Sequence, residues 1–236
     1  MARRTSGRVS AFRRTPLFAA IACALAQGAL AGTFYVDNGN DSGGGSLRQA
    51  INDANNDCAV NRVGSLITFR NGPFTIRPSS PLPDFNCAGI QYNVTLDGSS
   101  QGVAYGAVLN TDPTGFNATF GVTVDGSLIP YGNVCGLQMI DNGYGGQLGV
   151  QGMEIINFNY GGSGTGLCGN IYAAGNRLAN NANGMSITAG SIIGTYLPGD
   201  RNVIVGSSGA DRSAIELKGG YVQIENNFIG TRDGFT

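Results

Sequence analysis

The feature that most constrains the fold is a repeat near the C-terminus of this 236-residue chain. Residues 176–195 and residues 202–231 each contain an apolar segment that begins with Asn, a second apolar segment, and an Ile-Gly-Thr triplet. The triplets begin at Ile193 and Ile229. Short apolar segments that recur at a period of about 36 residues, separated by Asn and Gly, are typical of solenoids, in which each unit buries its face against the next.

Asparagine recurs in the same stretch at a shorter interval. Asn176, Asn202 and Asn226 follow one another at a nearly constant spacing of about 25 residues, a usual length for one solenoid coil. Coils of that length, with one loop at residues 196–200 or 207–213, account for the longer repeat equally well, and we expect a binding surface on these two loops. Because Asn tolerates a left-handed backbone and its amide can bond to an Asn on the next coil, the spacing predicts an Asn ladder. The alternative is that Asn is only a common turn residue.

Short segments rich in β-branched and aromatic residues, bounded by Gly, Asn, Asp or Pro, run through the rest of the chain and predict strands. They lie at residues 33–36, 66–69, 74–76, 93–96, 121–124 and 152–156. One helix interrupts this pattern.

Leu47, Ala50, Ile51 and Ala54 have the i, i+3, i+4, i+7 spacing of one apolar helix face. Ser46 and Gln49 form a Ser-x-x-Gln capping box before it, and Asn residues at 55 and 56 are expected to end it. A single short helix followed only by strands suggests a lid over the end of a sheet structure.

Residues 1–31 have the three parts of a secretory signal peptide. Five Arg residues precede an apolar run at residues 17–26, and Ala29-Leu30-Ala31 provides an Ala-x-Ala cleavage site. The apolar run is shorter than the roughly 20 residues that a permanent membrane span requires. We therefore expect cleavage after Ala31, a mature chain that starts at Gly32, and a secreted or cell-surface protein without a permanent membrane span.

Loss of the leader makes the chain acidic. Five of the 14 basic residues leave and no acidic residue does, so 9 basic and 15 acidic residues remain, a formal charge of −6. This balance argues against a nucleic-acid partner, because binding to phosphates needs clustered Lys and Arg.

Four cysteines remain in the exported part: Cys58, Cys87, Cys135 and Cys168. Four cysteines allow three pairings, and an exported protein favours disulfides. We expect Cys58 with Cys87 and Cys135 with Cys168, because each pair is separated by about 30 residues, close to one repeat, and stacked coils bring such positions together. Buried free thiols are the alternative.

Three stretches of the sequence are similar to a known family. The chain resembles bacterial secreted right-handed parallel β-helix proteins in the segment Asp41-Ser42-Gly43-Gly44-Gly45-Ser46-Leu47-Arg48-Gln49-Ala50-Ile51 and in the segments at residues 202–206 and 226–231. In these, a Ser-Leu-Arg-Glu/Gln-Ala-Ile cap precedes coils of the form Asn-x-Ile-x-Gly and Asn-x-Ile-Gly-Thr. The resemblance implies an all-β, right-handed parallel β-helix of the pectate-lyase-like fold with one N-terminal capping helix. Fold kinship does not by itself transfer a catalytic function.

Asp97 and Asp125 are the candidates for catalysis. They occupy equivalent places in two Thr-x-Asp-Gly-Ser segments, and stacking on adjacent coils would bring them within about 5 Å. Hydrolysis of a glycosidic bond uses two carboxylates roughly 5 to 10 Å apart. Each Asp also precedes Gly, and Asp-Gly is a common turn pair, so the structural interpretation is favoured and no catalytic residue is expected.

No cofactor is expected. We consider Ca²⁺ only at residues 37–41 and 161–166, whose loops match calcium-binding loops poorly and read better as flexible turns. Arg201 and Arg212 each follow an Asp, an arrangement that more often gives a solvated ion pair than a lyase site.

The sequence thus predicts a signal peptide at 1–31, an N-terminal strand and capping helix at 32–60, and β-helix coils at 61–236. Since the chain stops in mid-coil, we expect a longer native product or a partner that covers this end. The expected role is structural, adhesive or glycan-binding without catalysis, with extracellular polysaccharide or envelope components as partners. The alternative is a polysaccharide lyase or glycoside hydrolase that acts on uronate-containing polysaccharides.

Overall fold

A computed structural model describes residues 32–87, 91–141, 145–206 and 212–230. The chain divides into two compact units, residues 1–30 and 31–236, and the described residues belong to the second. The predicted signal peptide, most of the loop at residues 207–213, and the C-terminal residues 231–236 lie outside them.

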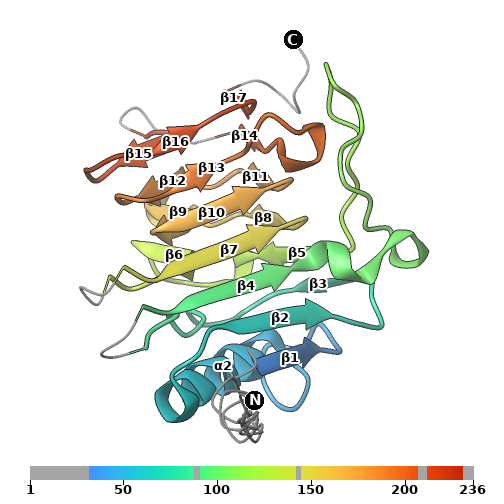
Figure 1. Ribbon diagram of the computed structural model, residues 1–236, viewed down its shortest axis with the longest axis vertical. Coiled ribbons are helices and arrows are strands. Elements are labelled where there is room, and N and C mark those ends of the chain that lie inside the picture. Colours follow the sequence, from blue (N-terminus) through green and yellow to red (C-terminus); the bar gives the residue numbers. More distant parts are fainter. Residues whose placement is uncertain (1–31, 88–90, 142–144, 207–211, 231–236) are drawn as a thin grey trace, which may run out of the picture. The chain divides into compact units, whose positions relative to one another are not determined.

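The strands form three parallel sheets that surround a main apolar core (Figure 1). The first sheet has the order β1-β2-β4-β7-β10-β13-β16, the second β3-β5-β8-β11-β14-β17, and the third β6-β9-β12-β15. From β7 onward the chain visits the first, second and third sheets in turn, and each strand pairs in parallel with the strand one coil earlier. The described chain is therefore an all-β parallel solenoid.

The bounds of the elements are as follows. The strands of the first sheet are β1 (Gly32–Val36), β2 (Ser65–Phe69), β4 (Asn93–Asp97), β7 (Gln147–Gln151), β10 (Ile171–Ala174), β13 (Ile192–Ile193) and β16 (Gln223–Ile224). Those of the second are β3 (Phe74–Ile76), β5 (Val122–Asp125), β8 (Glu154–Ile156), β11 (Arg177–Ala179), β14 (Val203–Val205) and β17 (Phe228–Ile229). Those of the third are β6 (Val134–Gln138), β9 (Gly164–Gly169), β12 (Asn183–Ile187) and β15 (Ile215–Leu217), and the helix is α2 (Leu47–Asn61).

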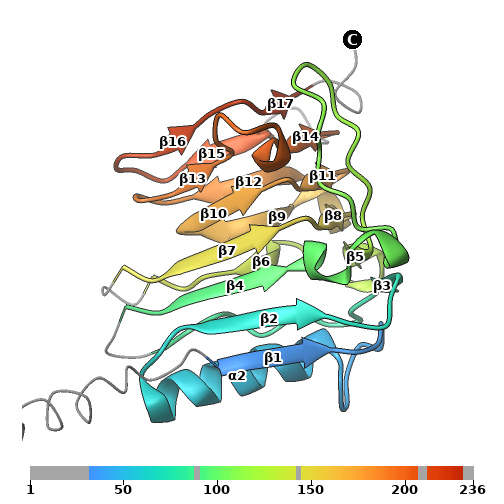
Figure 2. The same cartoon turned by 45° about the vertical axis from the view of Figure 1, so that its right-hand side comes forward.

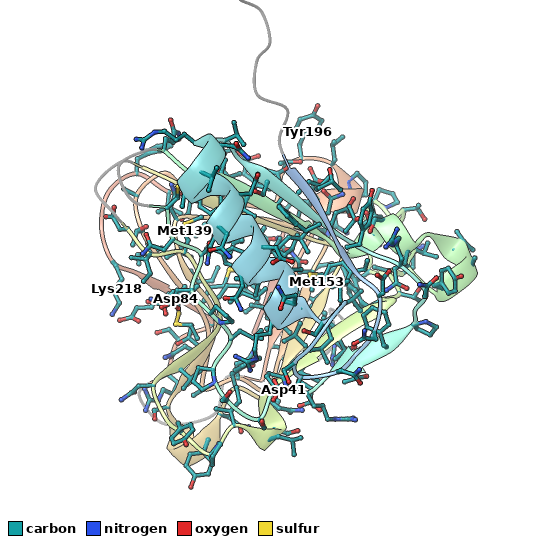
Figure 3. The ribbon with its side chains drawn as sticks, turned by 90° about the horizontal axis from the view of Figure 1, so that it is seen from below. Asp41, Asp84, Met139, Met153, Tyr196 and Lys218 are labelled. Carbon is teal, nitrogen blue, oxygen red and sulfur yellow. A yellow bond between two sulfur atoms is a disulfide. The ribbon has the colours of Figure 1, made fainter. Side chains whose placement is uncertain are left out.

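Helix α2 lies across the end of the stack that carries β1, as Figure 3 shows from below. Its apolar face is fully covered and consists of Leu47, Ala50, Ile51, Ala54 and Cys58. The helix is longer than predicted because the Asn residues at 55 and 56 do not end it. Cys58 extends the apolar face by one more turn, and Arg62 in the left-handed conformation terminates the helix.

The capping box forms only in part. Ser46 Oγ accepts a hydrogen bond from the backbone N–H of Gln49 at 3.2 Å, as expected of an N-cap. The Gln49 side chain does not return to Ser46 but donates to Asp53 Oδ1 at 2.6 Å.

Both disulfides join the cysteines in the pairing expected from their spacing. Cys58 of α2 is bonded to Cys87, and Cys135 of β6 to Cys168 of β9. The first links the helix to the segment that precedes β4, so it fastens the helix to the stack.

The repeat of the Ile-Gly-Thr triplet does not correspond to equivalent positions of the fold, so this part of the prediction is wrong. Ile193 lies in the first sheet and pairs with Ile224, whereas Ile229 lies in the second sheet and pairs with Ile204. The Asn-led segments do stack, since Arg177 and Val203, the residues that follow Asn176 and Asn202, are register partners.

Glycine-rich segments also form strands that the sequence patterns do not predict. Gly164-Thr165-Gly166, expected to be part of a flexible turn, begins β9, and only the residues before it form a turn. The predicted strand at residues 152–156 begins two residues late, because Gly152 has a φ of +63° and turns the chain from β7 into β8.

Candidate functional site

A long loop, residues 98–121, connects β4 to β5. It contains two short 3₁₀ turns, at Gly98–Gln101 and Val103–Tyr105, and a ribbon in which Val108 and Thr119 form an antiparallel bridge. Figures 1 and 2 show this segment, in green, rising beside the strands of the second sheet past the level of β14. The loop therefore covers part of the outer face of the second sheet.

Arg201, which precedes β14, anchors the far end of the long loop. Its side chain is buried, with 5% of the residue exposed. The guanidinium donates hydrogen bonds to three loop carbonyl oxygens, those of Asp112 (3.2 Å), Pro113 (2.7 Å) and Gly115 (2.6 Å). The predicted solvated pair with Asp200 is wrong, because Asp200 accepts from the Thr195 hydroxyl at 2.5 Å instead.

Asn110 reinforces this anchor from inside the loop. It is 2% exposed, and its amide donates to the carbonyl oxygens of Asp112 (3.0 Å), Gly115 (3.3 Å) and Pro198 (2.9 Å). Since Pro198 belongs to the segment between β13 and β14, the predicted loop at residues 196–200 holds the long loop in place. Arg212 is exposed, and its neighbour Asp211 lies outside the described residues.

A groove of about 510 Å³ lies between the long loop and the second sheet. It is lined by Phe116, Ala118, Thr119, Phe120, Glu154, Arg177 and Val203. Phe116 and Phe120 form its aromatic wall, with ring centroids 6.2 Å apart and an angle of 29° between the ring planes. Phe116 also packs on a small apolar cluster outside the main core, which includes Val203 and Val205 of β14.

The floor of the groove is polar and charged. Glu154 of β8 faces Arg177 of β11, its partner in the register, and Arg177 Nη1 lies 2.7 Å from Glu154 Oε1. The Thr123 hydroxyl of β5 donates to Glu154 Oε2 at 2.9 Å. The Glu154 and Arg177 side chains remain 22% and 29% exposed, so a ligand in the groove can reach both.

A second hollow of about 260 Å³ adjoins the groove through Phe120, which lines both. Its other lining residues are Pro73, Phe74, Thr75, Gly121 and Thr123. Thr75 and Thr123 are register partners on β3 and β5. The two hollows together follow one outward-facing column of the second sheet over five strands, from β3 to β14.

This arrangement suits a ligand rich in hydroxyl groups. A carboxylate accepts and a guanidinium donates hydrogen bonds, and Arg binds carboxylates in a planar, two-pronged geometry. Aromatic rings provide apolar faces for the carbon side of such a ligand. The groove thus combines the contacts that an acidic or neutral sugar chain requires.

Asp97 and Asp125 do not stack on each other, so that prediction is wrong. Asp97 belongs to the first sheet, where it pairs with Gln151, and Asp125 belongs to the second, where it pairs with Ile156. The two Thr-x-Asp-Gly-Ser segments therefore lie on different sheets. Asp97 accepts from the Ser99 hydroxyl at 2.5 Å, as a turn-forming Asp does.

Asp125 is buried and fully engaged. It accepts from Asn157 Nδ2 (2.8 Å), the Ser127 N–H (3.0 Å) and Arg77 Nε (3.0 Å). Burial raises the pKa of Asp125, but the hydrogen bonds from Asn157 and Ser127 and the contact with Arg77 outweigh it, so the pKa lies below its usual value. A general acid needs the opposite shift, so Asp125 does not suit that role.

No group of three or more His, Cys, Asp or Glu side chains in the described ranges is positioned to hold a metal ion. In the segment considered for Ca²⁺, Asp37 pairs with Arg70 at 2.8 Å and Asp41 with Arg48 at 2.7 Å. Within the same ranges, no helix has both the length and the apolar character to cross a membrane.

Sequence reasoning missed the groove. Glu154 and Arg177 both lie in segments predicted as strands, but their pairing depends on the register between coils. One signal was present, because the predicted strands at 93–96 and 121–124 leave a long connection with two Phe residues. No family model matches the chain, and no curated protein is similar to it.

Proposed function

We propose that this protein is exported, is a right-handed parallel β-helix, and binds extracellular polysaccharide through the groove beside its second sheet, without catalysis. The observation that carries the proposal is the aromatic wall of Phe116 and Phe120 facing the charged floor of Glu154 and Arg177. Parallel strands joined by crossovers are right-handed in about 98% of cases, which supports the assigned hand.

Two further observations support export. Two disulfides are typical of proteins from oxidising compartments outside the cytosol. The cap residues Ser46, Leu47 and Arg48, which underlie the resemblance to secreted β-helix proteins, lie at the start of α2, where the resemblance predicts a capping helix.

Affinity measurements on defined oligosaccharides test the proposal. The exported protein would be titrated by calorimetry with uronate-containing and neutral chains. We expect binding that Phe120→Ala weakens by about 3- to 10-fold, the range for one lost aromatic contact. We expect Arg177→Gln to lower the affinity for uronate-containing chains more than the affinity for neutral chains.

Tyr221→Ala is the matched control, because Tyr221 is an aromatic residue that is 81% exposed and does not line the groove. If the wild type, Phe120→Ala and Arg177→Gln bind every chain with equal affinity, the groove is not the binding site.

One observation favours the alternative, a lyase or hydrolase that cuts uronate-containing polysaccharide. Asp125 and Glu154 lie on adjacent strands, and Thr123, two residues before Asp125, is the register partner of Glu154. This places two carboxylates on one face of the second sheet, about 8 Å apart at Cα. Assays for new reducing ends and unsaturated products, with Asp97→Ala, Asp125→Ala and Glu154→Gln as variants, read out this alternative. If the wild type forms such products and one of these variants does not, the protein is an enzyme, and the proposal of binding without catalysis is overturned.

A further inference from the structure

Gly32, the first residue of β1, lies against the carboxylate of Asp57 in α2. A Cβ atom added to Gly32 would be 2.5 Å from Asp57 Oδ2, so the carboxylate occupies the space that any side chain at this position would need. Standard backbone dimensions put the Gly32 nitrogen about 2.5 Å from the same Cβ position, and therefore within about 5 Å of that oxygen.

The Asp57 oxygen that faces Gly32 has no hydrogen-bond donor among the described residues. Asp57 Oδ1 accepts from Asn61 Nδ2 at 2.6 Å, but the buried Oδ2 accepts from no group. The hydroxyls of Ser65 and Tyr92 are also buried, the Ser65 hydroxyl lies close enough to Tyr92 to lower the pKa of Tyr92, and Ser65 is the register partner of Gly32. A buried carboxylate oxygen that accepts no hydrogen bond is costly, so a cation within reach of Asp57 Oδ2 would be stabilised.

Cleavage after Ala31 would create that cation. A peptidase hydrolyses the Ala31–Gly32 bond with one water: the hydroxyl goes to the Ala31 carbonyl carbon and the hydrogen to the Gly32 nitrogen, which takes up a proton at neutral pH. The nitrogen changes from a neutral amide with one N–H to an ammonium with three donors. We propose that the ammonium of mature Gly32 pairs with Asp57, so that removal of the leader completes the N-terminal end of the solenoid.

The position of Asp57 in α2 supports a cationic partner. Asp57 belongs to the last turns of the helix, where unpaired carbonyl groups give the helix end a partial negative charge. A cation near this end is stabilised both by the carboxylate and by the helix. The proposal depends on cleavage after Ala31 and is independent of the glycan groove.

The other ionisable groups around the cluster do not replace the ammonium. Asp53 lies one turn earlier on α2 and accepts from Gln49, and Arg62, whose backbone caps the helix, is exposed and does not donate to Asp57 Oδ2. Burial raises the pKa of Tyr92 to about 12, and the charge of Asp57 adds to this, so Tyr92 stays neutral at physiological pH. Tyr35, on β1, lies beneath the Arg70 guanidinium.

The test measures the pKa of the α-amino group directly. The full precursor is expressed with its own leader, and the exported product is checked by intact mass and N-terminal sequencing. Reductive methylation with ¹³C-formaldehyde then labels two amines, the α-amino group and Lys218, which is the only lysine of the chain. An NMR titration follows both, with Lys218 as the internal reference.

We expect an N-terminal Gly32 whose α-amino pKa is raised by roughly one unit or more above the usual 7.7–8.0. Asp57→Asn should return it to the usual range, whereas Asp53→Asn should leave it raised. An ordinary pKa in the wild type, the same pKa in Asp57→Asn, or another N-terminal residue would overturn the proposal.

A second measurement decides the case if Asp57→Asn is too unstable to titrate. A raised folded-state pKa means that the ion pair stabilises the protein fully below the unfolded pKa, near 7.7, and that this stability disappears as the pH rises through the folded value. We expect the melting temperature of the wild type to fall across this alkaline window by roughly 2–6 °C more than that of a chain acetylated at its α-amino group. Identical pH profiles of the two would overturn the proposal.

Discussion

Asn202 stacks on Asn176 in the interior of the solenoid, where Asn176 Nδ2 donates to Asn202 Oδ1 at 3.0 Å. Both residues have no exposed surface. Asn202 Nδ2 donates in turn to Asn227 Oδ1 at 2.9 Å, so the ladder continues with Asn227 and not with the predicted Asn226. Asn226 is in the left-handed conformation and accepts from Arg201 Nη2 at 2.5 Å. The left-handed bend and the ladder are thus made by neighbouring residues.

Asn202→Ala should lower the free energy of unfolding by about 2–4 kcal/mol, because it leaves the buried Asn176 N–H without its acceptor and removes the side-chain donor of the Ala173 carbonyl, which keeps only the Gly194 N–H. Chemical denaturation measures the loss. The exposed Asn86 is the control, and Asn86→Ala should change the value by less than about 0.5 kcal/mol. A loss of similar size in both variants would contradict a specific role for the ladder.

Arg201→Met should release the long loop. The substitution removes the guanidinium from all three carbonyl groups, and only those of Asp112 and Gly115 keep a second donor, the Asn110 amide, so we expect a cost of about 2–4 kcal/mol. Hydrogen exchange should quicken at residues 108–119 more than in the sheets. Arg212→Met, at an exposed position, should change neither exchange nor stability, and unchanged exchange in the Arg201 variant would show that other contacts hold the loop.

Removal of the disulfide between Cys58 and Cys87 should lower the free energy of unfolding by about 3–4 kcal/mol. The reason is that the disulfide closes a loop of about 30 residues in the unfolded chain. Denaturation of the Cys58→Ala, Cys87→Ala double variant measures this. Alkylation of the unfolded wild type without reductant should add no label, and label on any of the four cysteines would favour free thiols.

Asp125→Asn should destabilise the protein by about 1–3 kcal/mol at pH 7, since it breaks the contact with Arg77 and alters the hydrogen bond from Asn157. The folded-state pKa of Asp125 lies below the unfolded value of about 3.9, so its contribution is present above that pH and is lost as the pH falls through the folded value. The stability of the wild type and the variant should therefore converge below about pH 4. A constant difference down to the lowest pH would contradict the assignment.

The local patterns were informative where neighbouring residues decide the structure. The spacing of Leu47, Ala50, Ile51 and Ala54 predicted the apolar face of α2, and the strands at 74–76 and 93–96 lie within one residue of their predicted bounds. Turns that depend on a single left-handed residue, such as Gly152, were not located, because the same residue types also occur inside strands.

The sequence by itself determined the parallel solenoid, its helix, and the spacing that brings the cysteines together. Only the tertiary structure decided which coil positions meet: that Asp97 and Asp125 lie on different sheets, and that Glu154 faces Arg177 beneath Phe116. The physical reason is that coils differ in length, since the register partners Thr165 and Asn183 are much closer in the sequence than the register partners Ile193 and Ile224. A fixed sequence period therefore does not give the register, which packing of the interior side chains sets one coil at a time.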